Sequence, residues 1–211
     1  PVTPVMISYI ERGIEAAERD GAEVLIVQLD TPGGQVDLMG EVVRTILDAD
    51  VPVVVYVYPP GAYAASAGTL ITLAGHVAAM APGTTIGAAS PVGGQGEDLG
   101  ETLEQKLKED LKAQARALTG RRGEAAVEWA EAAIDEARAA TADEALALGV
   151  IDFVASDVED LLAQMDGLEI ELRGEQVTLD TAEAEIREVP MTLFEQILHI
   201  ITNPTIAFIL L

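Results

Sequence analysis

The sequence contains no cysteine and has little histidine, lysine or aromatic side chain. Without cysteine there is no disulfide scaffold, no thiolate metal site and no cysteine nucleophile. The two histidines, His76 and His199, lie far apart in the sequence, so a histidine-based metal site is not expected and no cofactor is implied. Aromatic residues make up 4% of the chain and hydrophobic residues 49%, which predicts an aliphatic core.

Basic residues are also scarce, with 12 Lys and Arg against 36 Asp and Glu, which gives a formal net charge of −24. A field of this sign repels a phosphate backbone, so no nucleic-acid partner is expected. There is no basic patch that would attract anionic lipid. The acidic surplus fits adaptation to high salt, and it equally fits an ordinary acidic domain.

Alternating apolar runs and helical patterns predict an α/β fold. Residues 22–30 and 51–58 form continuous apolar runs, as expected for strands buried on both faces, and residues 76–81 predict a third, short strand. Apolar side chains at helical spacing follow the first run, and a helix reaching about Ala74 follows the second. This order indicates a parallel sheet with right-handed crossovers.

Residues 82–100 are rich in glycine and predict one long irregular loop. The later patterns predict, in order, helices near 101–118 and 123–139, a helix capped at Thr141, a strand at 151–155, a short helix near 157–165 and a hairpin at 168–180.

The C-terminal segment 193–211 is apolar except for Glu195, His199 and a few small polar residues. Asn203 and Pro204 predict the cap and first position of a new apolar helix. The seven residues that follow are too few to span a bilayer, which takes about 20. A buried terminal helix and the beginning of a membrane segment both remain open.

Two glycine-bearing turns, "DTPGGQ" (30–35) and "PPGAYAASAG" (59–68), follow the first two predicted strands. In a parallel sheet both turns emerge at the carboxyl ends of the strands, where sites form in α/β proteins. Gly33 and Gly34 on one turn, with the amide of Ala67 on the other, could make an oxyanion hole beside Ser66. The alternative for Ser66 is a helix start packed tightly among small residues.

A serine nucleophile needs a base. His76 begins a strand at the opposite end from the turns, and His199 lies in the apolar tail, so neither is suitable. Lys106, Lys108 and Lys112 remain, all on one predicted helix. A lysine base must lose its proton near neutral pH, about 3 units below its usual pKa of roughly 10.4, which requires burial. Surface ion pairs are the alternative role, and helical phase does not choose among the three.

The motifs "QLDTPGG", "YVYPPGAYAASAGTLITLAGHVAAMAPGTTIGAASPV" and "TADEALALGVIDFVA", in this order, resemble the NfeD-like membrane serine proteases of the Clp-protease/crotonase superfamily, which are related to signal peptide peptidase A. The resemblance implies a Clp-protease/crotonase-like parallel sheet with crossover helices, a small C-terminal hairpin and an apolar tail. The serine of the family's "AASAGT" motif is the nucleophile and matches Ser66. Its partner is a lysine that opens the helix ending in an Arg-x-Leu element. That element is Arg116–Leu118 here, which gives Lys106.

The family's oxyanion donors carry over to Gly34, with Gly33 as the alternative, and to Ala67. The histidine of the Clp triad falls near Ala89, so a Ser–Lys dyad replaces the triad. Lys108 is an extra lysine and leaves a second candidate for the base.

The resemblance implies a membrane-associated, ATP-independent serine endopeptidase. It assigns residues 1–166 to a Clp-protease-like catalytic domain, 167–190 to a small β extension and 191–211 to an apolar tail that begins a truncated membrane region. A further strand is expected upstream of Pro1. The expected partners are peptide or protein substrates with apolar segments, a stomatin-like membrane protein among them, and further copies of the chain in a homo-oligomer.

Two other functions are compatible with these motifs. A non-catalytic scaffold would keep the fold and bind a stomatin-like partner without turnover. A crotonase-like acyl-CoA enzyme would use the same oxyanion geometry without a serine nucleophile. The Ser66 and Lys106 pair argues against the acyl-CoA enzyme, as does the lack of a basic residue near the two turns for a CoA phosphate.

Overall fold

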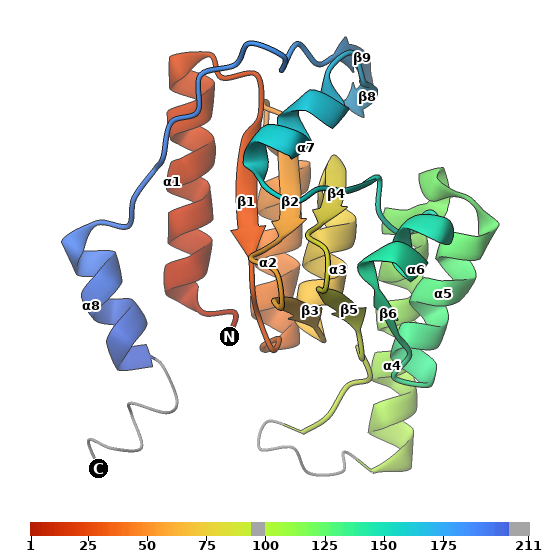
Figure 1. Cartoon of the computed structure of the whole chain (residues 1–211). Helices are drawn as coiled ribbons and strands as arrows, with labels where there is room; N and C mark the ends of the chain where they lie inside the picture. The colour runs from red at the N-terminus through yellow and green to blue at the C-terminus, as the bar shows by residue number, and fades with distance from the viewer. Residues whose placement is uncertain (94–99, 203–211) are drawn as a thin grey trace.

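The structure is a computed structural model that describes residues 1–93 and 100–202 of the chain. A parallel sheet with the strand order β1–β2–β4–β7 lies at its centre (Figure 1). Its strands are β1 (Leu25–Leu29), β2 (Val53–Val57), β4 (Val77–Met80) and β7 (Phe153–Val154). The predicted α/β fold with a parallel sheet is confirmed.

Side chains along β2 alternate between two parts of the core, one on each face of the sheet. All five residues of β2 are buried. Val53, Val55 and Val57 pack on one face, which helices cover: α1 (Pro4–Asp20), α2 (Val36–Leu47) and α3 (Ala67–Ala74). Val54 and Tyr56 pack on the other face, against α7 (Val158–Met165) and the hairpin β8–β9 (Glu169–Leu172 and Glu175–Thr178). The continuous apolar run of this strand therefore reflects burial on both sides.

Strand β1 departs from the expectation of burial on both faces. Leu25, Ile26 and Val27 are only half-buried. β1 is the edge of the sheet and, within the described residues, pairs only with β2. An edge strand with a long apolar pattern leaves part of that surface exposed, so the expectation was wrong for β1.

Helix α1 was not predicted, although its signals are present in the sequence. The Thr3 side chain caps the helix by accepting from the amide of Met6, Pro4 begins the helix, and Gly21 ends it in the left-handed conformation. Four buried residues recur at helical spacing and join the core on the face of the sheet that α1 covers: Ile7, Ile10, Ile14 and Ala17.

The predicted loop 82–100 contains a strand, β5 (Thr85–Gly87). β5 pairs with β3 (Tyr63–Ala65) in parallel and with β6 (Ala139–Thr141) antiparallel, which makes a second small sheet. Strands of only three residues carry no readable alternation, so the prediction of one irregular loop was wrong here. The helix expected to reach 139 ends at Asp135 because residues 139–141 pair with β5.

The remaining helices lie close to where the sequence predicts them: α4 (Glu101–Thr119), α5 (Glu124–Asp135), α6 (Ala142–Ala147) and the 3₁₀ turn Gly120–Arg122 between α4 and α5. α6 begins with the expected cap, since Thr141 Oγ1 accepts from the amide of Glu144 and the Glu144 carboxylate accepts from the amide of Thr141. The hairpin turns at Arg173 and Gly174, both of which have positive φ.

The last described element is α8 (Leu193–Thr202), which lies beside α1 at the lower left of Figure 1. None of the helices within residues 1–93 and 100–202 has the length and apolar character that crossing a bilayer requires. The predicted cap at Asn203 and Pro204 lies outside the described residues.

Replacing Tyr56 tests the second part of the core. The buried Tyr56 hydroxyl donates to the carbonyl of Ala155 (2.7 Å), and burial raises the pKa of Tyr56 to about 12. We expect Tyr56→Phe to lower the free energy of unfolding by about 1 kcal/mol at pH 7. In the unfolded chain tyrosine ionises near pH 10, whereas folded Tyr56 stays neutral up to about pH 12. The wild-type protein therefore loses stability between roughly pH 10 and 12, and Tyr56→Phe, which cannot ionise, does not.

The measurement is urea unfolding of both proteins at pH 7 and across the alkaline range. The difference in unfolding free energy between them should narrow above pH 10. A difference in unfolding free energy that stays constant above pH 10 would contradict the raised pKa of the buried Tyr56 hydroxyl.

Candidate active site

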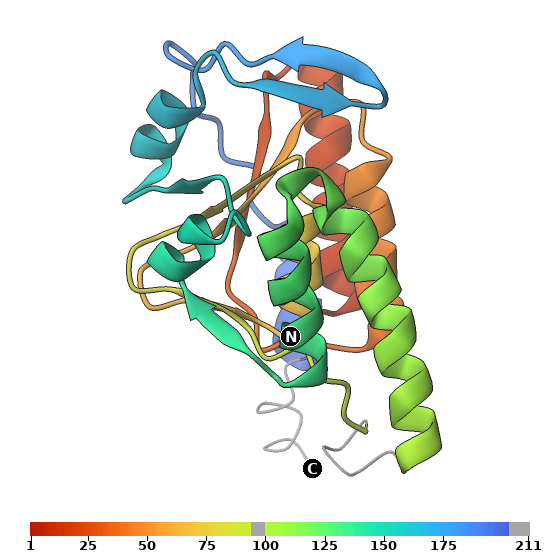
Figure 2. The same cartoon turned by 90° about the vertical axis from the view of Figure 1, so that its right-hand side faces the viewer.

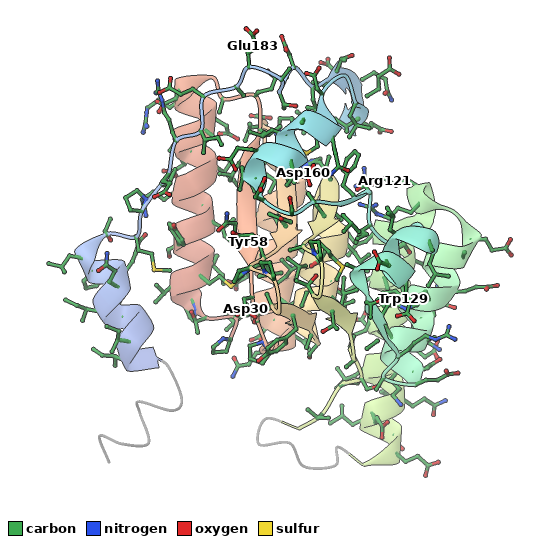
Figure 3. All side chains as sticks on the ribbon, viewed as in Figure 1. Asp30, Tyr58, Arg121, Trp129, Asp160 and Glu183 are labelled. Atoms are coloured by element: carbon green, nitrogen blue, oxygen red, sulfur yellow. The ribbon has the colours of Figure 1, made fainter. Side chains whose placement is uncertain are left out.

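The two glycine-bearing turns meet beyond the carboxyl ends of β1 and β2. The amide of Thr31 donates to the carbonyl of Tyr63 (2.8 Å), and the amide of Ala65 donates to the carbonyl of Thr31 (3.1 Å). Asp30 adds a third link, because its carboxylate accepts from the amide of Tyr63 (3.2 Å). Figure 3 shows Asp30 at this end of the sheet. The meeting of the turns, expected from the topology, is therefore fixed by backbone pairing.

Ser66 stands between β3 and α3 in an unusual backbone conformation. It occupies the N-cap position of α3 with φ 53° and ψ −120°. A positive φ is uncommon for serine and persists only where the surroundings impose it. Its amide donates to the carbonyl of Gly87 (3.0 Å), and the Thr69 hydroxyl also donates to that carbonyl (3.0 Å). This sharp strand-to-helix turn is the kind that presents a nucleophile.

Gly33 lies directly against Ser66. A Cβ added at Gly33 would lie 2.6 Å from Ser66 Cβ and 3.0 Å from Ser66 Oγ, and Gly33 itself has φ +112°. Only glycine combines that backbone conformation with so close an approach. The first turn therefore reaches the half-buried serine side chain because residue 33 has no side chain of its own.

The amide of Gly33 is already engaged, whereas those of Gly34 and Ala67 are available. Gly33 donates to Thr31 Oγ1 (3.1 Å), and its carbonyl accepts from the amide of Val2 (2.8 Å). In the part of the chain that the structure describes, no acceptor takes the amide of Gly34 or of Ala67. Ala67 is the first residue of α3, where amides have no partner within the helix. The two available amides are therefore those of Gly34, which follows Gly33, and Ala67, which follows Ser66.

Sequence reasoning missed the role of Thr31. Its side chain is buried and takes up the Gly33 amide, and its backbone pairs with the second turn. The signal was available, since a threonine two residues before a glycine in a turn commonly accepts from that glycine's amide.

The three candidate lysines all lie on α4. Lys108 Nζ pairs with Glu104 (2.7 Å) and donates to the carbonyl of Asp135 (3.3 Å). Lys112 Nζ pairs with Glu109 (2.6 Å) and with Asp135 (3.0 Å). Both therefore take the ion-pair role that was the alternative to catalysis.

Lys106 is exposed, and the described residues offer it no hydrogen bond or ion pair. α4 begins at Glu101, and its buried residues begin only at Leu111. Figure 2 shows the first turns of α4 extending away from the sheet at the lower end of the molecule. The structure thus brings the two turns together, and within the described residues no hydrogen bond or ion pair joins Lys106 to either turn.

His76 has a packing role, as expected. It is buried, its Nδ1 accepts from the amide of Val53 (3.0 Å), and its carbonyl accepts from Arg121 (3.0 Å). Burial, followed by the charge of Arg121, lowers the pKa of His76. The side chain of His199 lies outside the described part. Within the residues that the structure describes, no group of His, Asp and Glu could hold a metal ion.

Known proteins resemble the chain over its whole length. A family model described as NfeD1b, N-terminal domain, matches residues 1–173. The membrane-bound protease PH1510 of Pyrococcus horikoshii is 39% identical over 214 residues, which cover 100% of this chain and 48% of that protein. The membrane protein NfeD1b of Bacillus subtilis is 35% identical over 91 residues, 43% of this chain and 20% of that protein. The chain thus spans about half the length of the first relative.

Solved structures agree with the fold. The 1510-N membrane-bound stomatin-specific protease, as a Lys-to-Ala mutant with a substrate peptide, matches with a TM-score of 0.86 at 36% identity, covering 96% of this chain and 93% of that one. Its Ser-to-Ala mutant matches with a TM-score of 0.83, also at 36% identity, over 90% and 93%. ClpP1 of Listeria monocytogenes matches at 0.58 and 17% identity over 74% and 87%, which shows the fold alone. The predicted Clp-protease-like fold is confirmed.

The approach of Gly33 to Ser66 can be tested with two glycine-to-alanine changes. Gly33→Ala adds a strained φ and a clash with Ser66, whereas Gly61→Ala adds a strained φ (+89°) in open space. We expect Gly33→Ala to lower the free energy of unfolding by about 1–3 kcal/mol more than Gly61→Ala, as an overpacked contact does. Urea unfolding gives both values. Equal losses in the two variants would show that the turn does not press against Ser66.

Proposed function

Because the chain belongs to the family of NfeD1b N-terminal domains, we propose that it is the catalytic domain of a membrane-bound serine endopeptidase with a Ser66–Lys106 dyad and no cofactor. The observation that carries this proposal is the position of Ser66, on a sharp turn directly before Ala67 and against Gly33. Within the described residues the amides of Ala67 and of Gly34, which follows Gly33, have no acceptor. The relatives support it: PH1510 is named a protease, and 1510-N has been solved with a serine or a lysine replaced.

The proposed reaction starts with neutral Lys106 taking the proton of Ser66 Oγ as that oxygen attacks the scissile carbonyl. The amides of Gly34 and Ala67 bind the resulting oxyanion, and one such donor contributes about a hundred- to a thousand-fold in rate. Lys106 then returns its proton to the leaving amine. A water molecule, activated by the same lysine, hydrolyses the acyl-enzyme. Gly33 acts through its close approach to Ser66, because its own amide donates to Thr31.

Lys106 must lie within hydrogen-bond reach of Ser66 and lose its contact with water in order to act as the base. A base works at about 2.6–3.2 Å from the proton it takes, and such contacts often tighten only with substrate bound. The first ten residues of α4 contain no buried side chain, so shifting them breaks few apolar contacts. We propose that a bound peptide covers this end of α4 and desolvates Lys106.

The substrate class and location follow from the relatives as proposals. 1510-N is named stomatin-specific and membrane-bound, and one structure holds a substrate peptide. We propose that this chain cleaves apolar segments of a stomatin-like membrane protein, acts at a membrane and assembles as a homo-oligomer. Residues 1–166 would be its catalytic domain, with the β8–β9 hairpin in the extension 167–190 and α8 in the tail 191–211.

One observation favours a second function, the non-catalytic scaffold. Lys106 is exposed, and the described part of the structure shows no contact that would hold it near Ser66. A scaffold would keep the two turns as a peptide-binding edge and would never need a base.

Labelling with a fluorophosphonate separates the two functions. An activated Ser66 reacts with the probe, and Ser66→Ala should lose both labelling and at least about a thousandfold of peptide hydrolysis, as removal of a serine nucleophile does. Ser90→Ala is the matched control, because Ser90 is also half-buried and donates to the carbonyl of Ile134 (2.6 Å). An unlabelled wild-type protein would favour the scaffold, and labelling that persists in Ser66→Ala would exclude Ser66 as the nucleophile.

A second experiment compares Lys106 with Lys108. Arginine stays charged near neutral pH and cannot take the proton of a serine. Lys108→Arg can keep its pairing with Glu104. We therefore expect Lys106→Arg to be inactive and Lys108→Arg largely active in a peptide-cleavage assay, with similar melting temperatures. The reverse pattern would assign the base to Lys108.

A further inference from the structure

Helix α8 is attached to α1 through the polar side of its first turn. Arg12 donates from Nε and a terminal nitrogen to both carboxylate oxygens of Glu195 (3.0 and 2.7 Å). The amide of Thr192 also donates to that carboxylate (2.6 Å), and Arg12 donates to the carbonyl of Pro190 (2.9 Å). The hydrogen bond from Arg12, with that from Thr192, lowers the pKa of Glu195 to about 2. Glu195 is only 8% exposed, so this face of α8 is closed against α1.

The opposite face of α8 is apolar and exposed. Five side chains form it and are called here the α8 stripe: Leu193, Phe194, Ile197, Ile200 and Ile201, which are 47–74% exposed. Their spacing places them on one side of the helix, opposite Glu195. A surface helix ordinarily turns its apolar stripe towards the core. α8 does the reverse, holding the domain by a carboxylate and presenting its apolar side outward.

We propose that the α8 stripe lies in the interface of a lipid bilayer with neutral head groups, with the helix along the membrane plane. The ten described residues of α8 are about 15 Å long, half of the roughly 30 Å of a bilayer core, which is a suitable length for a helix that lies along a membrane surface. No Asp, Glu, Lys or Arg follows Glu195, although such residues make up 23% of the chain. Absence of charge beside an outward apolar face is what immersion at this depth requires.

The charge of the chain decides the kind of lipid. Amphipathic helices that bind anionic membranes carry Lys and Arg on their polar face, and α8 carries neither. The net charge of −24 opposes approach to an anionic surface. Burial of the apolar side chains therefore has to supply the attraction, which favours a zwitterionic surface such as phosphatidylcholine.

A second copy of the chain fits the α8 stripe less well. The stripe is about 15 Å long and about 10 Å wide, on the order of 150 Å², whereas a stable interface buries about 800 Å² of each partner. A bilayer can bind a small apolar stripe, because it does not have to present a complementary surface of that size.

The position of α8 determines which side of the domain would face the bilayer. In Figures 1 and 2, α8 lies in the same lower half of the molecule as β3 and β5, the strands beside the two turns. The α8 stripe faces away from α1, so a membrane in contact with it would lie on the side of α8 opposite α1. This inference rests on α8 alone and stands whether or not Ser66 is a nucleophile.

The chain contains no cysteine, so a single introduced cysteine can carry an environment-sensitive dye. Ile197→Cys places the dye on the α8 stripe, and Leu47→Cys places it at a site of matched exposure on α2 (47% and 46%). With phosphatidylcholine vesicles we expect a blue shift, and quenching by lipid-chain nitroxides, at 197 but not at 47. A dye at 197 that is unchanged while the protein floats with vesicles would overturn the proposal. So would a blue shift without vesicles that grows with protein concentration, which would identify a second copy as the occupant.

A pair of double variants tests the same surface without a dye. Ile197→Gln with Ile200→Gln should lower the vesicle partition coefficient about tenfold or more, since two half-exposed aliphatic side chains are lost. Leu47→Gln with Leu146→Gln removes as much exposed apolar surface elsewhere and should leave partition unchanged. Binding to phosphatidylcholine should not weaken between about 0.1 and 1 M salt, because it does not depend on charge attraction. Equal partition of the two double variants, or loss of binding in salt, would overturn the proposal.

Discussion

The backbone pairing of Thr31 with the segment 63–65 is the constraint on which the site depends. It joins the turn after β1 to the turn after β2, and each turn alone is a flexible glycine-bearing segment. The Thr31 side chain adds a second constraint, because its hydroxyl takes the Gly33 amide and leaves the next amide, that of Gly34, available. Ser66 is held in its positive-φ conformation by contacts with Gly87 and by the close approach of Gly33. The available amide of Gly34 and the positive φ of Ser66 therefore both depend on the pairing of these two turns.

Rigidity is unevenly distributed around this edge. β2 and α3, which carry the second turn, are buried along their whole length, so Ser66 and Ala67 rest on the least mobile part of the core. The first half of α4, which carries Lys106, has no buried residue. A nucleophile on a fixed support and a base on a loosely packed helix would make activity depend on an event that brings them together, such as peptide binding. In the scaffold alternative, peptide binding does not bring Lys106 to Ser66 and no reaction follows.

Charged side chains are common in most of the chain and absent from the apolar face of α8. Acidic residues outnumber basic ones in the chain by 36 to 12, and some of them are paired on the surface with Lys108 and Lys112 of α4. Residues after Glu195 carry no charge, and α8 turns its apolar side outward. Glu195 and Arg12 lie at the boundary between the charged part of the chain and this apolar face, since their ion pair fixes the polar face of α8 to α1.

The sequence by itself determined the parallel sheet, the crossover helices, the hairpin and the meeting of the two turns, because apolar runs, helical spacing and glycine positions are local signals. It also singled out Ser66, through its place among small residues after a buried strand. It did not reveal that β1 is an edge strand or that residues 85–87 pair with β3 and β6, since strand neighbours are set by contacts between distant residues. Only the tertiary structure showed that the Gly33 amide is already engaged, that Lys108 and Lys112 are ion-paired, and that Lys106 is exposed. Those properties depend on which groups lie within hydrogen-bond distance in the folded chain, and spacing along the sequence does not specify that.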